Sequence, residues 1–167
     1  MRIEVVLGTG VGETTLSAFD NALVKAGVHN YNLIVLSSVI PKQSEVIRVV
    51  RYQASHNEWG HRLYIVKADV RSELIGNSIA AGLGWYQLED GRGMFVEHDS
   101  IADNIEEVEM RVKNRIRKSL YDLCINRALL FNQDRMQMSL SSTEVKDKPA
   151  CALVVAVYQS EDWKVEL

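Results

Sequence analysis

Hydrophobic residues along the chain form short β-branched runs and longer stretches with helical spacing. Residues 3–7 are an apolar run that ends in the glycine-rich stretch 8–12, which predicts a strand leading into a tight turn. A helix is expected next, from Thr14 to a stop at Gly27, because apolar residues recur every three or four positions. Residues 31–40 are almost continuously apolar and predict a strand buried on both faces.

Strand-like segments dominate the middle of the chain. Three further strands are expected, over 46–50, 63–70 and 94–96. The stretch 54–60 is polar enough to be a loop. The stretch 75–88 is rich in Ala and Gly, so it fits either a buried strand or a closely packed helix, and its periodicity does not decide between them.

A long amphipathic helix is the clearest element. Apolar side chains between 101 and 123 share one stripe, and Ser100 with Asp103 predicts a capping box at the start. Acidic residues precede basic ones on the opposite face, which favours a solvated face that complements the helix dipole over an anion site. Strands over 136–145 and 151–158 follow. This order predicts an α/β (α+β) fold, a mixed αββα-type layered sandwich in a single domain over 1–167.

Composition narrows the classes of function. The 167 residues are 47% hydrophobic and 25% charged, as in an ordinary globular domain. The net charge of −3 argues against a nucleic-acid partner, and the chain shows neither a bilayer-length apolar run nor a signal peptide. We therefore expect a cytoplasmic protein with no membrane partner. Cys124 and Cys151 lack metal-site spacing and the four His are scattered, so no metal is expected.

A predicted strand, the glycines of Gly8-x-Gly10-x-Gly12 and a predicted helix follow one another as in a phosphate-binding loop. The spacing of the glycines, however, differs from both common versions of that loop. A dinucleotide fingerprint needs its third glycine where Glu13 stands, and a Walker loop needs Gly-Lys followed by Ser or Thr. Glu13 would also repel a phosphate at the start of a helix. We expect a tight turn or a close backbone approach here instead of a nucleotide site.

Ser37 and Ser38 interrupt the apolar run at 31–40. Two hydroxyls inside a buried strand must find partners or cost about 1–3 kcal/mol each. Taken alone, the pair is explained by hydrogen bonds to nearby carbonyls or by a bulge.

The residues around this pair resemble one known family. The stretches GETTLSAFDNAL at 12–23, AG at 26–27, NL at 32–33 and SSVIP at 37–41 are similar, at matching spacing, to the pyruvoyl-dependent arginine decarboxylases. Weaker similarity continues through the long helix to the strand at 151–158, so it covers nearly the whole chain. The stretch 48–62 does not match, and Lys42 stands where some relatives carry a second proline.

The resemblance implies that the chain cleaves itself between Ser37 and Ser38. Ser38 Oγ would attack the carbonyl carbon of Ser37, and elimination and hydrolysis would leave a pyruvoyl group, the cofactor, at position 38. The products would be a β chain of residues 1–37 and an α chain of residues 38–167. In the family an asparagine placed like Asn32 steadies the oxyanion, although Asn32 alone reads as a turn residue.

The same resemblance implies decarboxylation of L-arginine to agmatine and CO2. The pyruvoyl group would act as the electron sink. Glu97 would be the acid that protonates the substrate's α-carbon, and its apolar neighbours would favour the protonated form. Asp20 would bind the guanidinium, with Leu23 against the aliphatic part of the substrate. Judged without the resemblance, Glu97 and Asp20 would be solvated surface carboxylates.

Family members assemble as trimers, sometimes doubled, with the site near a subunit boundary, so the resemblance implies a homo-oligomer. Two alternatives stay open: the same chemistry on another amino acid, or an uncleaved, non-catalytic homologue that binds or regulates. The joint presence of Ser38, Asn32, Glu97 and Asp20 argues against the second alternative.

Overall fold

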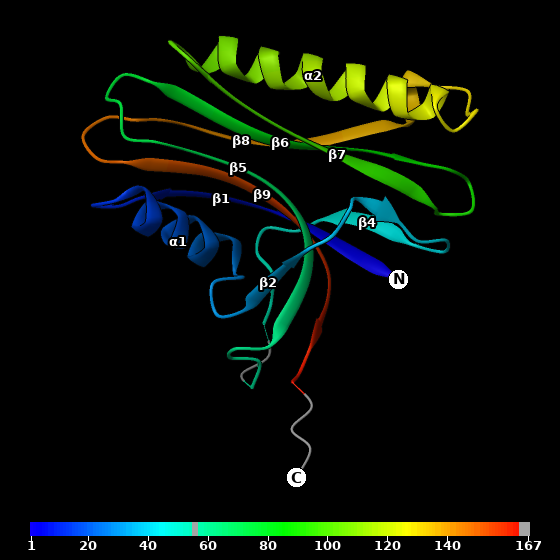
Figure 1. Cartoon of the computed structure of the whole chain (residues 1–167), viewed down its shortest axis with the longest axis horizontal. Coiled ribbons are helices and arrows are strands. Elements are labelled where there is room, and N and C mark those ends of the chain that lie inside the picture. The colour runs from blue at the N-terminus through cyan, green and yellow to red at the C-terminus, as the bar shows by residue number, and fades with distance from the viewer. Residues whose placement is uncertain (55–56, 164–167) are drawn as a thin grey trace.

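A computed structural model describes residues 1–54 and 57–163 as four stacked layers (Figure 1). In chain order the elements are β1 (Arg2–Val11), α1 (Thr15–Ala26), β2 (Asn32–Val35), β3 (Val39–Ile40), β4 (Glu45–Arg48), β5 (Arg62–Ser72), β6 (Ser78–Gln87), β7 (Gly93–Ala102), α2 (Ile105–Ile125), the 3-10 turn η1 (Gln133–Arg135), β8 (Met136–Glu144) and β9 (Ala150–Glu161).

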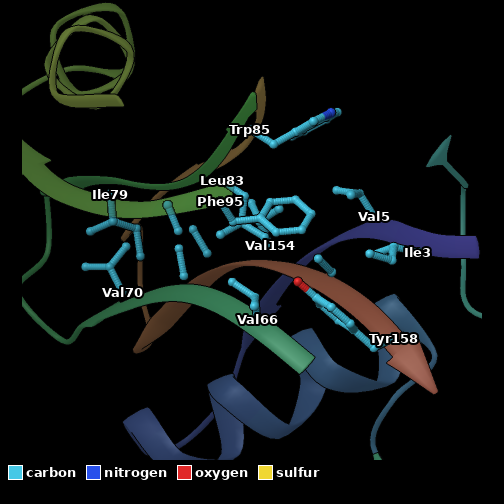
Figure 2. Packing of buried hydrophobic residues seen from close by; sticks show 14 of the residues in the cluster. Ile3, Val5, Val66, Val70, Ile79, Leu83, Trp85, Phe95, Val154 and Tyr158 are labelled. Carbon is cyan, nitrogen blue, oxygen red and sulfur yellow. The ribbon is translucent and has the colours of Figure 1, made fainter. Parts of the chain in front are cut away.

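Two sheets pack face to face between the helices. The five-stranded sheet has the order β2-β5-β9-β1-β4 and the four-stranded sheet the order β3-β7-β6-β8. Side chains from both sheets, among them Val66, Leu83 and Val154, fill the core between them (Figure 2). Helix α1 covers the outer face of the five-stranded sheet and α2 that of the four-stranded sheet (Figure 1). The αββα sandwich expected from the sequence is confirmed.

The glycine-rich stretch continues β1 and does not form the predicted turn. Strand β1 runs to Val11 and pairs with β9 along this stretch. Helix α1 lies directly on it, because a Cβ at Gly10 would overlap the Ala18 carbonyl oxygen and the Ala22 nitrogen. The glycines therefore serve close packing of a helix on a strand, the second of the two expectations. Gly27 ends α1 with a left-handed φ of 87°, as predicted.

The prediction of one strand over 31–40, buried on both faces, is wrong. The chain forms β2 at one edge of the five-stranded sheet and β3 at one edge of the four-stranded sheet. Edge strands leave one side open, so Val35 and Val39 are 57% and 58% exposed. Ser37 and Ser38 lie where the chain crosses from one sheet to the other.

The stretch 75–88 contains a strand, β6, which lies between β7 and β8 and is buried on both faces. Gly84 in β6 leaves room for Ile116 of α2, which explains the small residues there. The short strand predicted over 94–96 is the start of the ten-residue β7. Ser100 belongs to β7, so the predicted capping box is wrong: the N-cap of α2 is Asn104.

The charged face of α2 is solvated as predicted, with Lys113 and Glu109 paired at 3.0 Å. Cys124 and Cys151 are buried free thiols. Residues 55 and 56 of the polar loop predicted over 54–60 lie outside the described residues. Within the part of the chain that the structure describes, no helix is long and apolar enough to cross a membrane, and no group of His, Cys, Asp or Glu is arranged to hold a metal.

Replacing Gly10 with Ala is expected to lower the free energy of unfolding by about 3 kcal/mol or more, because the methyl group overlaps backbone atoms of α1. Gly76→Ala is the matched control. Unlike Gly10, Gly76 has a positive φ, 91°, but nothing lies within 4 Å of its Cβ position, so only backbone strain of about 1–2 kcal/mol is expected. Urea denaturation followed by circular dichroism measures both. Equal losses would contradict the close-approach role of Gly10.

Candidate active site

The crossing between β2 and β3 holds Ser38 in an unusual backbone conformation. Its φ is 68°, in the left-handed region that non-glycine residues adopt at a cost. The Ser38 carbonyl oxygen accepts a hydrogen bond from the Phe95 backbone N–H at 2.8 Å. This bond continues the pairing of β3 with β7, which begins at Val39 and Met94. The pairing of β3 with β7 thus fixes Ser38 through its carbonyl group.

The side chain of Ser38 meets Glu97. Its Oγ donates a hydrogen bond to the Glu97 carboxylate, which β7 presents two residues beyond Phe95. A carboxylate in this position can accept the proton of the serine hydroxyl. Glu97 itself is exposed, so the apolar environment predicted for it is wrong for the single chain.

The backbone angle of Ser38 also decides where its Cβ lies relative to the preceding peptide bond. In an L residue Cβ is offset by about 120° from the carbonyl carbon around N–Cα, so a φ of 68° sets the torsion from the Ser37 carbonyl carbon to Ser38 Cβ at about −50°. Attack by Oγ on that carbon forms a five-membered ring, which needs a small torsion. Helix and strand values of φ give about 100° to 180°. The left-handed conformation therefore favours the attack.

Tyr158 contacts the residue that follows Ser38, and the sequence did not predict this contact. Its hydroxyl donates to the Val39 carbonyl oxygen at 3.0 Å, although 119 residues separate them in the chain. Burial, and secondarily the negative charge of Glu97, raises the pKa of Tyr158. A single tyrosine at the end of an apolar strand carries no sequence signal for this contact, because strand β9 belongs to the opposite sheet.

Asn32 is held away from Ser38. It is the first residue of β2, which ends at Val35, about 10 Å farther along the strand. Its side-chain amide donates to the Gly60 carbonyl oxygen at 2.6 Å, and the Trp163 indole N–H donates to the same oxygen at 2.9 Å. Gly60 belongs to the stretch 48–62, where the residues themselves show no resemblance to the family. That stretch therefore positions a predicted site residue.

Asp20 and Leu23 lie on α1, in the outer layer of the five-stranded sheet. Asp20 is exposed, whereas Leu23 is 7% exposed and packs in the core under the helix. The residue that precedes Asp20, Phe19, packs toward that core, and the guanidinium of Arg71 lies over its ring at 3.7 Å. Of the predicted site residues, the structure joins Ser38 to Glu97 and leaves Asn32, Asp20 and Leu23 elsewhere.

The model of the family described as pyruvoyl-dependent arginine decarboxylase matches residues 2–162. This chain belongs to that family. It is similar to the pyruvoyl-dependent arginine decarboxylase of Thermococcus kodakarensis, with 33% identity over 156 residues and 93% of each chain covered. The one from Pyrococcus furiosus is 31% identical over 156 residues, with 87% of each chain covered. The one from Halobacterium salinarum is 37% identical over 111 residues, 62% of this chain and 68% of the relative. The resemblance seen in the sequence is confirmed.

The residues around Ser38 fit a pyruvoyl group formed in place. Ser38 carries the hydroxyl that the group is built from, and that hydroxyl contacts a carboxylate able to take its proton. The carbonyl oxygen that would adjoin the group has a donor in the Phe95 N–H. The pyruvoyl group is the cofactor of this family.

Proposed function

We propose that this chain cleaves itself between Ser37 and Ser38 and then decarboxylates L-arginine to agmatine and CO2. Membership of the family supports the chemistry. The observation that carries the proposal is the left-handed Ser38, whose hydroxyl is bonded to the Glu97 carboxylate.

Self-cleavage uses atoms of the chain and one water. Ser38 Oγ, oriented by its hydrogen bond to Glu97, attacks the Ser37 carbonyl carbon; its proton passes to the nitrogen as the carbon–nitrogen bond breaks, and an ester remains. Loss of the α-proton of residue 38 expels the Ser37 carboxylate and leaves dehydroalanine at 38. Water then replaces the nitrogen, which leaves as ammonia, so residues 38–167 begin with a pyruvoyl group and residues 1–37 end in a carboxylate.

The pyruvoyl group supplies an electron sink for the loss of CO2, as pyridoxal phosphate does in other enzymes. Glu97 holds the proton that replaces CO2 on the substrate's α-carbon. The Phe95 N–H, 2.8 Å from the Ser38 carbonyl oxygen, stabilises negative charge on that oxygen. The carboxylate of Asp20 takes the guanidinium, and Leu23, one turn along α1, contacts the aliphatic part of the substrate through the 7% of its surface that stays exposed. Asn32 donates to the oxyanion formed during self-cleavage only once its side-chain amide is released from the Gly60 carbonyl oxygen.

A second copy of the chain completes this site. Asp20 lies on the outer face of one sheet and Glu97 on a strand of the other, so residues from one copy serve Ser38 of its neighbour. Exposed apolar side chains flank the cleavage point, as expected of a surface that a partner covers: Ile34, Val35 and Val39. The proposed assembly is a trimer or a dimer of trimers. A cytoplasmic location, inferred from the sequence, remains part of the proposal.

Ser38→Ala is expected to abolish both cleavage and CO2 release from arginine, because the nucleophile is lost. The unchanged protein should give bands of about 4 and about 15 kDa on a denaturing gel, in proportion to 37 and 130 of its 167 residues and 18.9 kDa. Ser37→Ala is the matched control: it alters the adjacent hydroxyl but keeps the carbonyl that is attacked, so it should still cleave. An intact band from active protein would refute the pyruvoyl mechanism.

Glu97→Gln is expected to permit cleavage, since the amide oxygen still accepts from Ser38 Oγ, but to slow decarboxylation by about 10² to 10⁴-fold, because an amide delivers no proton. Asp99→Asn changes another exposed carboxylate of β7, two residues along, and should leave both steps unchanged. Gel analysis and release of labelled CO2 separate the two steps. Normal turnover by Glu97→Gln would remove Glu97 from its role as the acid.

Co-expression of Ser38→Ala with Asp20→Ala chains tests the shared site. Each variant alone should be inactive, but a neighbour pair that combines Ser38 from one chain with Asp20 from the other is complete. Random assembly should therefore restore about a quarter of the unchanged activity. No recovery in mixed oligomers that contain both chains would show that one chain holds the entire site.

A further inference from the structure

Two hydrogen bonds from different sheets hold the residues that follow the cleavage point. The Phe95 N–H of β7 binds the Ser38 carbonyl oxygen, and the Tyr158 hydroxyl of β9 binds the Val39 carbonyl oxygen at 3.0 Å. Strand β7 belongs to the four-stranded sheet and β9 to the five-stranded sheet. The first bond is part of the pairing of β3 with β7. The second depends on one side chain.

Tyr158 is well fixed for this contact. It is 8% exposed and belongs to the core between the sheets, where its ring meets that of Phe95 edge to face with centroids 6.3 Å apart. Figure 2 shows that the two rings enter this core from different sheets, Phe95 from β7 and Tyr158 from β9. Because burial and the nearby Glu97 charge raise the pKa of Tyr158, its hydroxyl keeps the proton that it donates.

We propose that Tyr158 is a positioning residue for self-cleavage. Its hydroxyl holds the Val39 carbonyl and thereby keeps Ser38 in the left-handed conformation that brings Cβ toward the Ser37 carbonyl carbon. This inference rests on the proposed function, since it concerns the step that forms the pyruvoyl group.

The physical reason is the cost of that conformation. A left-handed φ at a residue with a β-carbon costs about 1–2 kcal/mol, so a Ser38 freed from its anchors relaxes toward an extended φ. Relaxation turns Cβ away from the Ser37 carbonyl carbon and removes the geometry for attack. The fold should survive the loss of the hydroxyl, because the Tyr158 ring packs in the core and β3 remains paired with β7.

The test compares two tyrosine variants in freshly translated, full-length chain. Tyr158→Phe removes only the hydroxyl, and we expect cleavage at least about tenfold slower, the effect of leaving one acceptor without its donor. Tyr64→Phe is the matched control: its hydroxyl binds Glu161 at 2.7 Å within the five-stranded sheet, and its ring packs against the same core. Its cleavage rate should equal that of the unchanged chain. Fragment bands on a denaturing gel give the rates, and thermal melts compare the stabilities.

Hydroxylamine, which cleaves esters but spares peptide bonds, identifies the step affected. A positioning defect acts before the ester forms, so uncleaved Tyr158→Phe chains should resist hydroxylamine. A donor in place of the hydroxyl should restore the rate, which Tyr158→4-aminophenylalanine tests.

Three results would overturn the role of Tyr158: cleavage of Tyr158→Phe at the unchanged rate, an equal slowing in Tyr64→Phe, or prompt release of fragments by hydroxylamine. A variant that melts at a much lower temperature and is not rescued by 4-aminophenylalanine would also overturn it. If the unchanged chain itself does not cleave, the proposed function fails, which is a different outcome from a cleaving chain that is indifferent to Tyr158→Phe.

Discussion

The chain must pass from one sheet to the other within the three residues between β2 and β3, and the site depends on that constraint. Upstream, β2 pairs in parallel with β5, and the Leu36 N–H still binds the Ile65 carbonyl oxygen at 2.8 Å. Downstream, the Ser38 carbonyl oxygen is already paired with β7. The change of direction falls on residues 37 and 38. The left-handed φ of Ser38 follows from this short connection, and it brings Ser38 Cβ toward the preceding carbonyl carbon.

The layers around this crossing have distinct tasks. Strand β7 brings Glu97 to the Ser38 hydroxyl, while β9 crosses the core to reach the Val39 carbonyl with Tyr158. Helix α2 and the glycines of β6 pack tightly enough to hold β7 in place. Helix α1 carries Asp20 on the far side of the five-stranded sheet, which is why a partner copy enters the proposed site. In the proposed site, one chain builds the half that cleaves and a neighbouring copy supplies the half that binds substrate.

Much of the architecture was predictable from local pattern. The helical stripe over 101–123, the stop at Gly27 and the order of strands and helices led to the αββα sandwich, because periodicity reports which face of an element is buried. The motif SSVIP with the surrounding residues led to Ser38 and the family. The sequence was less informative where small residues occur: the stretch 8–12 was predicted as a turn and 75–88 was undecided, because glycine marks both turns and close packing.

The sequence by itself determined the layers and the family and pointed to Ser38 as the candidate reacting serine, since these follow from residue type, spacing and motif. Only the tertiary structure decided that residues 31–40 divide between two sheets, that Asn32 and Trp163 both donate to the Gly60 carbonyl oxygen, and that Tyr158 reaches Val39. Each of these depends on pairing between segments far apart in the chain. No local pattern encodes which strands become neighbours, so hydrogen bonds across sheets appear only when the fold is complete.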